Sequence, residues 1–479
     1  MYLLCNQQEK VHFLPSLLHH NFPTEGKRKK GERSQKEKNF NNFSNPQLLF
    51  FTPSNYHFFS FSIISIIQRK QLCLPLIKVR FKPEIALDEY NYTNNCHVET
   101  PAPDYSIKNS DVVSKYKTAG EISNKVIAQV KALAVDGATT YDLCTKGDEL
   151  MNEELSKIYN SKKTKNTPKG IAFPTCVNPN HIPAHLAPVN AEDEANITLH
   201  NGDVVNIMLG IQIDGFPSIV AETLVIGASK ESPVTDKRAD LLNAAWTASE
   251  AALRTFKPSN RNWDVTNVVS KVAKEYETVP LENMLSHNQE RLVLYGPKEI
   301  ILNPSKQNKN SMETHRFEEN EVYGLDILIS TSADGKTKPS NFRTSMYKLT
   351  GETYALKMKM SHKILTEFKA KCNNQPFPYN IRNLEDPKKS RGGLAEPVNH
   401  KILLPYDVVV EKEGEYVAQF FTTFGITKHG IVKYTSPEFD ADFYKSDKLI
   451  KDEEILKTLE EPLNTKPVKK KGTTATEQN

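Results

Sequence analysis

The hydrophobic pattern of residues 201–227, NGDVVNIMLGIQIDGFPSIVAETLVIG, predicts a β-hairpin. Two β-rich runs flank an Asp214-Gly215 turn, and the first run alternates between apolar and other side chains. One face of this run would present Val205, Ile207, Leu209, Ile211 and Ile213. The opposite face would present Val204, Asn206, Met208, Gly210 and Gln212. That second face therefore carries amides and a thioether but no acid.

Helical periodicity precedes this hairpin. Residues 111–137 and 141–159 predict two helices joined by a threonine-rich turn. Residues 160–170 follow as a lysine-rich loop, and residues 171–189 have no regular pattern, so we expect them to be irregular.

The same order of elements recurs after the hairpin. Residues 235–258 and 260–276 predict another pair of helices, and residues 317–335 predict a strand and a turn. Asp142 and Asp264, which open the second helix of each pair, are 122 residues apart. The order indicates an internal duplication of about 120 residues.

The strands repeat at a similar distance. Asp203 and Glu321 open them 118 residues apart, so Met208 in the first half corresponds to Asp326 in the second. Two α/β halves facing one another would place a pocket between their sheets. Two acids placed symmetrically there would suit a metal pair, whereas a single acid would not.

Composition divides the chain into three parts. Residues 1–105 look unlike the rest and are interpreted as a low-complexity appendage, either disordered or the product of an incorrectly assigned start of the coding sequence. Residues 106–445 form the main domain, with an insert near 300–316, and residues 446–479 form a C-terminal helix and a lysine-rich tail.

Two runs in the appendage need separate interpretation. Residues 26–38, GKRKKGERSQKEK, suit a nuclear-import or nucleic-acid tail, or simply disorder. Residues 58–67 are apolar but too short to span a bilayer, and the N-terminus does not read as a signal peptide, so no membrane contact is expected.

Charge and cysteine content narrow the class of protein. The chain has 479 residues, a net charge of +4 and six cysteines without a C-x-x-C pair, which favours reduced thiols over zinc or disulfides. Residues 1–80 carry 12 Lys+Arg and 4 Asp+Glu, a surplus of +8, so the remaining residues sum to −4. Any nucleic-acid contact of the main domain must therefore come from local patches.

Four polar residues are candidates for a site. His185 lies before the hairpin, with His181 four residues earlier, and His287 follows the second helix pair. Together with Asp326 they could form a remnant metal or acid–base site. Alternatively, each is a satisfied polar group in a cleft. A hydrolase with two hard metals would need several bridging carboxylates, which the hairpin lacks.

Lysine-rich stretches are candidates for phosphate contact. They are expected to be flexible loops, although such runs are often only solvated. The candidate residues are Lys162, Lys163, Lys165, Lys169, Lys306, Lys309, Lys466, Lys469, Lys470 and Lys471. The sequence has no recognisable RRM, KH or helix-turn-helix signature.

The segment 448–463 predicts an amphipathic helix. Leu449, Ile450, Leu456 and Leu459 would lie on one side of it. This face would pack on the main domain or enter the groove of a partner, and packing is favoured.

Several stretches together resemble a known family. They include KKTKNTPKGIAFPT, ADLLNAAWTASEAALRTFKP, NEVYGLDILIS, YALKMKMS and KEGEYVAQF, besides the hairpin. From about residue 106 to 460 the chain resembles the proliferation-associated, or Erb-B-three-binding, protein family. That resemblance implies the α+β pita-bread fold of type 2 methionine aminopeptidases, with two pseudo-symmetric α/β halves.

The resemblance also implies a ligand set. The aminopeptidases hold two metals with two Asp, one His and two Glu, and use a further His near the substrate. The further His matches His185, the ligand His matches His287, and Asp326 stands at one Glu position. The two Asp positions hold Met208 and Ile219, and the last Glu position holds Phe421. We therefore expect no metal, no cofactor and no peptidase activity.

The family resemblance implies a binding function. Its members bind ribosomes and structured RNA, act in ribosome biogenesis, translation control and cell growth, and move between the cytoplasm and the nucleus or nucleolus. The alternatives are a working metal-dependent aminopeptidase, a DNA-binding protein and a scaffold for signalling proteins. The tail is shorter and less basic than in animal relatives, and ILKTLEE lacks a complete L-x-x-L-L motif, so nuclear-receptor contacts are not expected.

Overall fold

The computed structural model describes residues 103–464. The expectations for residues 1–102, including the basic run 26–38, lie outside the described residues, as do those for Lys466, Lys469, Lys470 and Lys471. Within residues 103–464, no helix is both long and apolar enough to cross a membrane.

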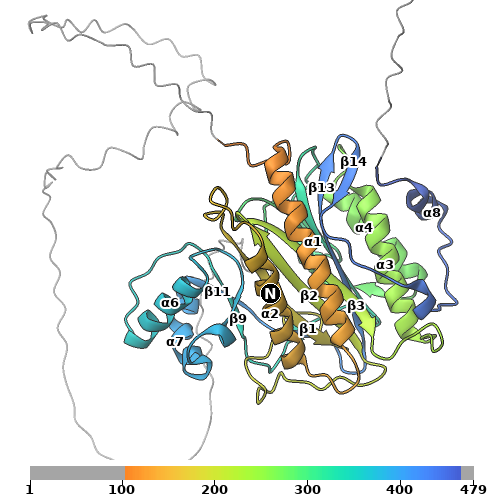
Figure 1. The fold of residues 1–479 in the computed structure, drawn as a ribbon. Helices are drawn as coiled ribbons and strands as arrows, with labels where there is room; N and C mark the ends of the chain where they lie inside the picture. The colour runs from red at the N-terminus through yellow and green to blue at the C-terminus, as the bar shows by residue number, and fades with distance from the viewer. Residues whose placement is uncertain (1–102, 465–479) are drawn as a thin grey trace, which may run out of the picture. The chain divides into compact units, whose positions relative to one another are not determined.

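An antiparallel sheet of nine strands, which differ in length, forms the centre of the described domain (Figure 1). Its order is β1-β2-β3-β13-β7-β5-β6, with β14 paired to β13 and β4 paired to β7. The strands are β1 (Lys169–Pro179), β2 (Val204–Ile213), β3 (Phe216–Val225), β4 (Val279–Pro280), β5 (Leu285–Gln289), β6 (Glu299–Ile301), β7 (Val322–Ser330), β13 (Val417–Thr427) and β14 (Gly430–Lys433).

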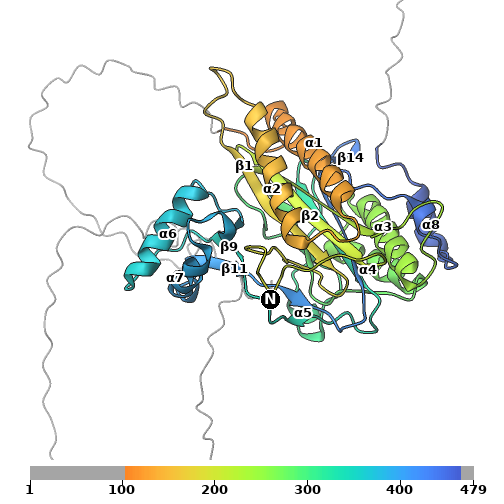
Figure 2. The same cartoon turned by 60° about the horizontal axis from the view of Figure 1, so that its bottom comes forward.

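Four long helices cover one face of this sheet (Figures 1 and 2). They are α1 (Ser110–Leu133), α2 (Thr140–Lys157), α3 (Lys237–Thr255) and α4 (Asn262–Glu275). The side chains of Asn109, Thr139 and Asp236 cap the first three, each accepting a hydrogen bond from a first-turn backbone amide. The apolar faces of α1 and α2 pack on the first half of the sheet, and α3 packs on β7 and β13.

The structure confirms the predicted hairpin. β2 and β3 pair from Val204 opposite Val225 to Ile213 opposite Phe216. The turn residues Asp214 and Gly215 have φ of 54° and 82°, the left-handed conformation that a tight hairpin turn needs. All ten residues of β2 are buried, and α1 packs against this strand.

The two predicted halves exist, but they do not face one another across a pocket. β2 begins at Val204 and β7 at Val322, which preserves the spacing of 118 residues. The halves lie side by side in one sheet because β13 pairs with β3 of the first half and with β7 of the second. This pairing satisfies the edge strands that two separate sheets would leave open.

Residues 171–189 were expected to be irregular, but residues 171–179 belong to strand β1, so the prediction was wrong for them. β1 pairs with β2 from Lys169 to Pro179. The pairing register shifts twice, between Ile171 and Phe173 and between Phe173 and Cys176. These irregularities interrupt the side-chain alternation, which is why the hydrophobic pattern did not reveal the strand.

Two other local predictions also need correction. The stretch with Lys306 and Lys309 was expected to be a flexible loop, but a short helix, α5 (Lys306–Ser311), begins there after the capping residue Ser305. In the segment 448–463 only α8 (Glu453–Glu460) is helical. Its buried residue is Ile455, whereas Leu449 and Leu456 are 69% and 42% exposed, so the predicted apolar face is wrong in part.

An insertion subdomain lies beside the β1 edge of the sheet in both views (Figures 1 and 2). It contains α6 (Lys359–Lys371), α7 (Pro387–Asn399), the short helix η3 (Ile381–Asn383) and a sheet of β9 (Met346–Leu349), β10 (Tyr379–Asn380) and β11 (Leu403–Tyr406). The remaining elements are the pair β8 (Lys338–Pro339) and β12 (Val409–Val410), and η4 (Ala441–Phe443).

A buried arginine docks this subdomain on the main domain. The Arg382 guanidinium donates to the Asp148 carboxylate of α2 at 2.5 Å and to the carbonyls of Pro188 and Cys144 at 3.1 Å each. The side chains of Arg382 and Asp148 are 5% and 7% exposed. The ion pair thus joins segments that are more than 200 residues apart in sequence.

Candidate functional site

Four residues form one row across the middle of the sheet. Met208 of β2 pairs with Ala221 of β3, Ala221 pairs with Phe421 of β13, and Phe421 pairs with Asp326 of β7. Side chains directly opposite each other in a sheet share a face. The duplication therefore places Met208 and Asp326 on the same face, with Phe421 between their strands.

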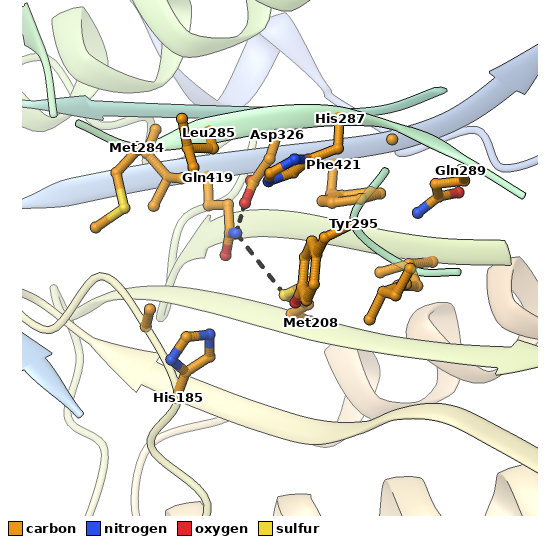
Figure 3. A pocket seen from close by; sticks show the side chains of 15 residues that line it. His185, Met208, Met284, Leu285, His287, Gln289, Tyr295, Asp326, Gln419 and Phe421 are labelled. Carbon is orange, nitrogen blue, oxygen red and sulfur yellow. Dashed lines mark hydrogen bonds between the residues drawn. The ribbon is translucent and has the colours of Figure 1, made fainter. Parts of the chain in front are cut away.

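A small pocket lies over this row (Figure 3). The structure brings together six of the seven residues considered for the site, because they line this pocket: His185, Met208, Ile219, His287, Asp326 and Phe421. The cavity volume is about 30 Å³. At roughly 10–15 Å³ per water, this space suits about two water molecules and is too small for a methionyl residue.

Asp326 is held by an amide. The Gln419 side chain donates from Nε2 to Asp326 Oδ1 at 2.7 Å, and the same nitrogen lies 3.8 Å from Met208 Sδ. Burial raises the pKa of Asp326 to about 7, although the hydrogen bond from Gln419 opposes this shift. Asp326 is therefore partly protonated near neutral pH.

His287 reaches the pocket from β5, where it pairs with Gly324 of β7. Neither ring nitrogen has a hydrogen-bond partner of normal geometry among the described residues. Burial lowers the pKa of His287 to about 4. The positive charge of Lys348 also lowers this pKa, whereas the interaction with the Gly296 backbone raises it. The imidazole is therefore neutral at physiological pH and available to a water molecule.

His185 lies on the other side of the pocket, in a strained backbone conformation with φ of 68°. Its Nδ1 is 3.2 Å from the carbonyl oxygen of Asp407, and its ring packs edge-on against Tyr406 at 5.2 Å. Burial lowers the pKa of His185 to about 4, against a raising contribution from Asp407. A neutral ring with the proton on Nδ1 fits this geometry. His181 does not line the pocket.

Apolar side chains fill the space above two glycines. A Cβ added to Gly324 would lie 2.5 Å from Cζ of Phe421, and a Cβ added to Gly210 would lie 2.6 Å from Cγ1 of Ile219. The Phe421 ring and the branched Ile219 side chain therefore pack directly against the backbone of the two glycines. The two apolar side chains are accommodated here by close packing.

Tyr295 covers part of the pocket from the segment between β5 and β6. Its ring is 5.0 Å from that of His287, and the Lys348 ammonium lies 5.2 Å from its centre. Arg291 fastens the segment by donating to the Asp214 carboxylate at 2.7 Å, and the Leu292 amide donates to the carbonyl of Gly215 at 2.7 Å. The second half thus closes over the hairpin turn of the first.

Sequence reasoning missed Gln419 and Tyr295. Gln419 lies two residues before Phe421 on the same strand and could have been found from that spacing, because alternate residues share a face. Nothing in the sequence around Tyr295 indicated that its segment folds over the pocket.

The side chains present do not fit a pair of hard divalent cations. Among residues 103–464 there is no group of three or more His, Cys, Asp or Glu side chains able to hold a metal ion. The pocket has one carboxylate, and an amide group already binds it. Two such cations require several bridging carboxylates, and a thioether at position 208 is a poor ligand for them.

The lysine candidates occupy different surroundings. Lys162, Lys163 and Lys165 are exposed in the turn after α2, and none forms an ion pair with another described residue. Lys169 is different, because it is half-buried and donates to the carbonyl of Ile158 at 2.5 Å. That bond ties Lys169 to the base of its own loop.

Lys306 and Lys309 are exposed on α5. Figure 2 shows α5 at one end of the described domain and the loop between α2 and β1 at the opposite end. The two lysine-rich stretches therefore do not form one continuous surface.

Comparison with known proteins identifies relatives over most of the chain. The family described as metallopeptidase family M24 matches residues 114–325. The curved DNA-binding protein of Schizosaccharomyces pombe is 47% identical over 78% of this chain and 95% of its own length. Proliferation-associated protein A of Dictyostelium discoideum is 36% identical over 78% of this chain and 96% of its own length.

Two further similarities agree with these. ERBB-3 binding protein 1 of Arabidopsis thaliana is 39% identical over 71% of this chain and 83% of its own length. A solved structure of a thermophilic Arx1 is 33% identical, with a TM-score of 0.69, and covers 75% of this chain and 100% of that one. Together with the family match, this structure confirms the predicted pita-bread fold.

Proposed function

Because this chain belongs to the M24 metallopeptidase family, in the group that includes proliferation-associated protein A and ERBB-3 binding protein 1, we propose that it acts by binding and not by peptide cleavage. Its proposed partners are ribosomes and structured RNA, with a role in ribosome biogenesis, translation control and cell growth. The proposed location is the cytoplasm and the nucleus, including the nucleolus, where ribosomes are used and assembled.

The pocket is the observation that carries the non-catalytic part of this proposal. Met208, Ile219 and Phe421 stand where resemblance to the aminopeptidases expects carboxylates, and the remaining cavity of about 30 Å³ has no room for a substrate residue. Metal-assisted hydrolysis needs a cation to polarise the carbonyl and to activate water. The side chains that line the pocket include one carboxylate, which is too little negative charge to hold such a cation.

Exposed lysines support the binding part. The loop at residues 161–165 carries three lysines without ion pairs to described residues. Residues 357–401, which span α6 and α7, carry ten Lys+Arg against four Asp+Glu. These stretches are positively charged, although residues 81–479 together have a net charge of −4. Such patches attract a phosphate backbone while the rest of the surface remains neutral to acidic.

A peptidase assay tests the first part. The purified full chain is incubated with a Met-Ala-Ser peptide and Mn²⁺, Co²⁺ or Zn²⁺, with a methionine aminopeptidase as the positive control. The proposal expects methionine release no faster than in the protein-free reaction. Release above that background with any of the three metals would overturn it.

A ribosome-pelleting assay tests the second part. Lys162, Lys163, Lys165, Lys469, Lys470 and Lys471 are replaced together by alanine. The control variant replaces Lys146 and Lys230, which lie outside both basic stretches and already pair with carboxylates. The proposal expects the first variant to leave the ribosomal pellet and the control to stay. Unchanged association of the first variant would contradict it.

DNA is the second candidate partner, and one observation favours it. The relative that is 47% identical is named a curved DNA-binding protein. Lysine–phosphate contacts weaken with salt for either nucleic acid, so salt alone does not separate the two. Competition does: if curved duplex DNA displaces the protein from ribosomes at concentrations lower than those of structured RNA, DNA is the partner.

A further inference from the structure

Residues 354–360, the segment that leads into α6, run along helix α7, which lies beside α6 (Figures 1 and 2). At the start of this segment the ring of Tyr354 stacks on that of His400, with 3.5 Å between ring centres and 10° between ring planes. At its end, a Cβ added to Gly393 would lie 3.1 Å from Cγ of Met360. His400 and Gly393 are seven residues apart, about two helical turns, so the segment follows one side of α7.

Two contacts hold the middle of this segment in place. The side chain of Leu356 is buried in the apolar core of the insertion subdomain. The backbone amides of Lys357 and Met358 donate to the two carboxylate oxygens of Glu396 in α7, at 2.6 and 3.1 Å. The backbone is thus fixed by its own polar and apolar anchors, and the other side chains of the segment are presented on a defined surface.

These presented side chains are largely apolar. Tyr354 is 41% exposed, and Met358 and Met360 are 46% exposed each. We define the Tyr–Met surface as these three residues together with Lys357 and Lys359, which are also exposed. Grouped apolar side chains at a protein surface mark a site of interaction, and methionine is common where a surface adapts its shape to a partner.

The Tyr–Met surface carries positive charge. Residues 353–363 contain three lysines and no Asp or Glu. Lys357 and Lys359 form no ion pair with a residue in the range 103–464, in contrast to Lys389 of α7, whose ammonium lies 2.8 Å from a carboxylate. The positive end of the α6 dipole also lies here, and its first turn contains no acidic side chain. A ligand of this surface is therefore negatively charged around an apolar centre.

The apolar side chains distinguish between the classes of acidic ligand. A phosphate oxygen and a thioether sulfur are both hydrogen-bond acceptors, so a phosphate backbone would cover Met358 and Met360 without forming a bond to them. A protein helix with leucine-like side chains on one face and Asp or Glu beside them satisfies both the methionines and the lysines. Amphipathic helices are bound in this way, through apolar residues spaced over about two turns.

We propose that the Tyr–Met surface docks an acidic amphipathic helix of a protein partner. The helix lies along residues 354–360 and covers Met358 and Met360, while its carboxylates meet Lys357 and Lys359. This contact goes beyond the proposed function, because it adds a protein partner that binds through apolar side chains on the insertion subdomain.

The test measures, by fluorescence anisotropy, binding of the full-length protein to a labelled helical peptide of about 18 residues with leucines on one face and glutamates on the other. A second peptide has the same composition, but its leucines are distributed around the helix. One protein variant combines Met358→Gln with Met360→Gln. Its matched control combines Leu449→Gln with Leu456→Gln, two exposed apolar residues elsewhere on the chain. Circular dichroism and thermal unfolding check that each variant is folded.

We expect the unmodified protein and the leucine control to bind the amphipathic peptide more tightly than the peptide with distributed leucines. The methionine variant should bind the amphipathic peptide about tenfold more weakly, because two half-exposed apolar side chains no longer contribute to the contact. A charge variant, Lys357→Glu with Lys359→Glu, should lose this peptide and bind a version in which lysines replace the glutamates. The same change at Lys306 and Lys309 of α5 should alter neither affinity.

Absence of peptide binding, or equal binding by the methionine variant and the leucine control, would overturn this inference. An RNA duplex that displaces the peptide and also loses affinity in the methionine variant would assign the surface to nucleic acid instead. Self-association of the protein in sedimentation velocity that the methionine variant abolishes would identify a second copy of the chain as the occupant. Each of these results would leave the peptidase and ribosome-pelleting tests of the proposed function unaffected.

Discussion

Gln419 donates a hydrogen bond to Asp326 across two neighbouring strands at 2.7 Å, and Asp326 is the only carboxylate that lines the pocket among residues 103–464. This hydrogen bond satisfies one oxygen of the buried carboxyl group. Met208, which corresponds to Asp326 in the duplicated half, lies 3.8 Å from the same amide nitrogen. Gln419 therefore links the two corresponding positions of the duplicated halves, one of which carries a carboxyl group and the other a thioether.

The first prediction concerns pH. Burial raises the folded-state pKa of Asp326 to about 7, above its unfolded value of about 3.9. The carboxyl group therefore contributes no penalty below about pH 4, and it destabilises the folded state progressively as pH rises to about 7. Asp326→Asn, which still accepts from Gln419, should become more stable than the wild type as pH rises, by up to about 4 kcal/mol. Urea unfolding at about pH 5 and pH 8 measures this gap, and a gap independent of pH would contradict the prediction.

The second prediction concerns the close packing of Phe421. Gly324→Ala should lower the free energy of unfolding by about 1–3 kcal/mol, because the new methyl group meets the Phe421 ring. Gly324→Ala combined with Phe421→Leu should recover part of this loss. The control is Gly392→Ala in α7, where nothing lies within 4 Å of the added Cβ, and it should not destabilise. Equal unfolding midpoints for the Gly324 and Gly392 variants would rule out the clash.

The third prediction concerns the docking of the insertion subdomain. Arg382→Met leaves the Asp148 carboxylate buried without its partner, which costs about 3–5 kcal/mol. Lys388→Met in α7 removes an exposed ion pair and should change stability by less than about 0.5 kcal/mol. Hydrogen exchange should accelerate in α6 and α7 of the Arg382 variant. Unchanged exchange there would mean that other contacts hold the subdomain.

The fourth prediction concerns water. Gln419 Oε1 and both ring nitrogens of His287 are buried without a hydrogen-bond partner of normal geometry in the described part of the chain, and the adjoining cavity has a volume of about 30 Å³. Buried polar groups of this kind bind ordered water. A crystal structure at a resolution that resolves waters should show about one or two ordered water molecules that bridge His287 and Gln419. A cavity without electron density for water would contradict this explanation of the polar atoms that lack partners.

Sequence reasoning reached the hairpin, the helix pairs and the pocket residues for identifiable reasons. Alternation around the Asp214-Gly215 turn fixes the two strands, and the 118-residue spacing relates Met208 to Asp326. The ligand positions at Ile219 and Phe421 came from family resemblance alone. The structure then placed all of them around one cavity.

The missed features depend on long-range contacts. β1 was not recognised because register shifts near Phe173 break its alternation. The role of Tyr295 depends on Arg291 reaching Asp214, 77 residues away, and no local pattern encodes that contact. The joining of both halves by β13 likewise pairs strands that are far apart in sequence. Local periodicity identifies elements, whereas these contacts are decided by tertiary packing.

The most direct test of the binding account is sedimentation of cell extract through a sucrose gradient at low and at high salt, with detection of this protein in each fraction. The account predicts that the protein migrates with ribosomal subunits at low salt and moves toward the top as salt rises, because lysine–phosphate contacts are screened. A position at the top of the gradient at both salt concentrations would contradict it.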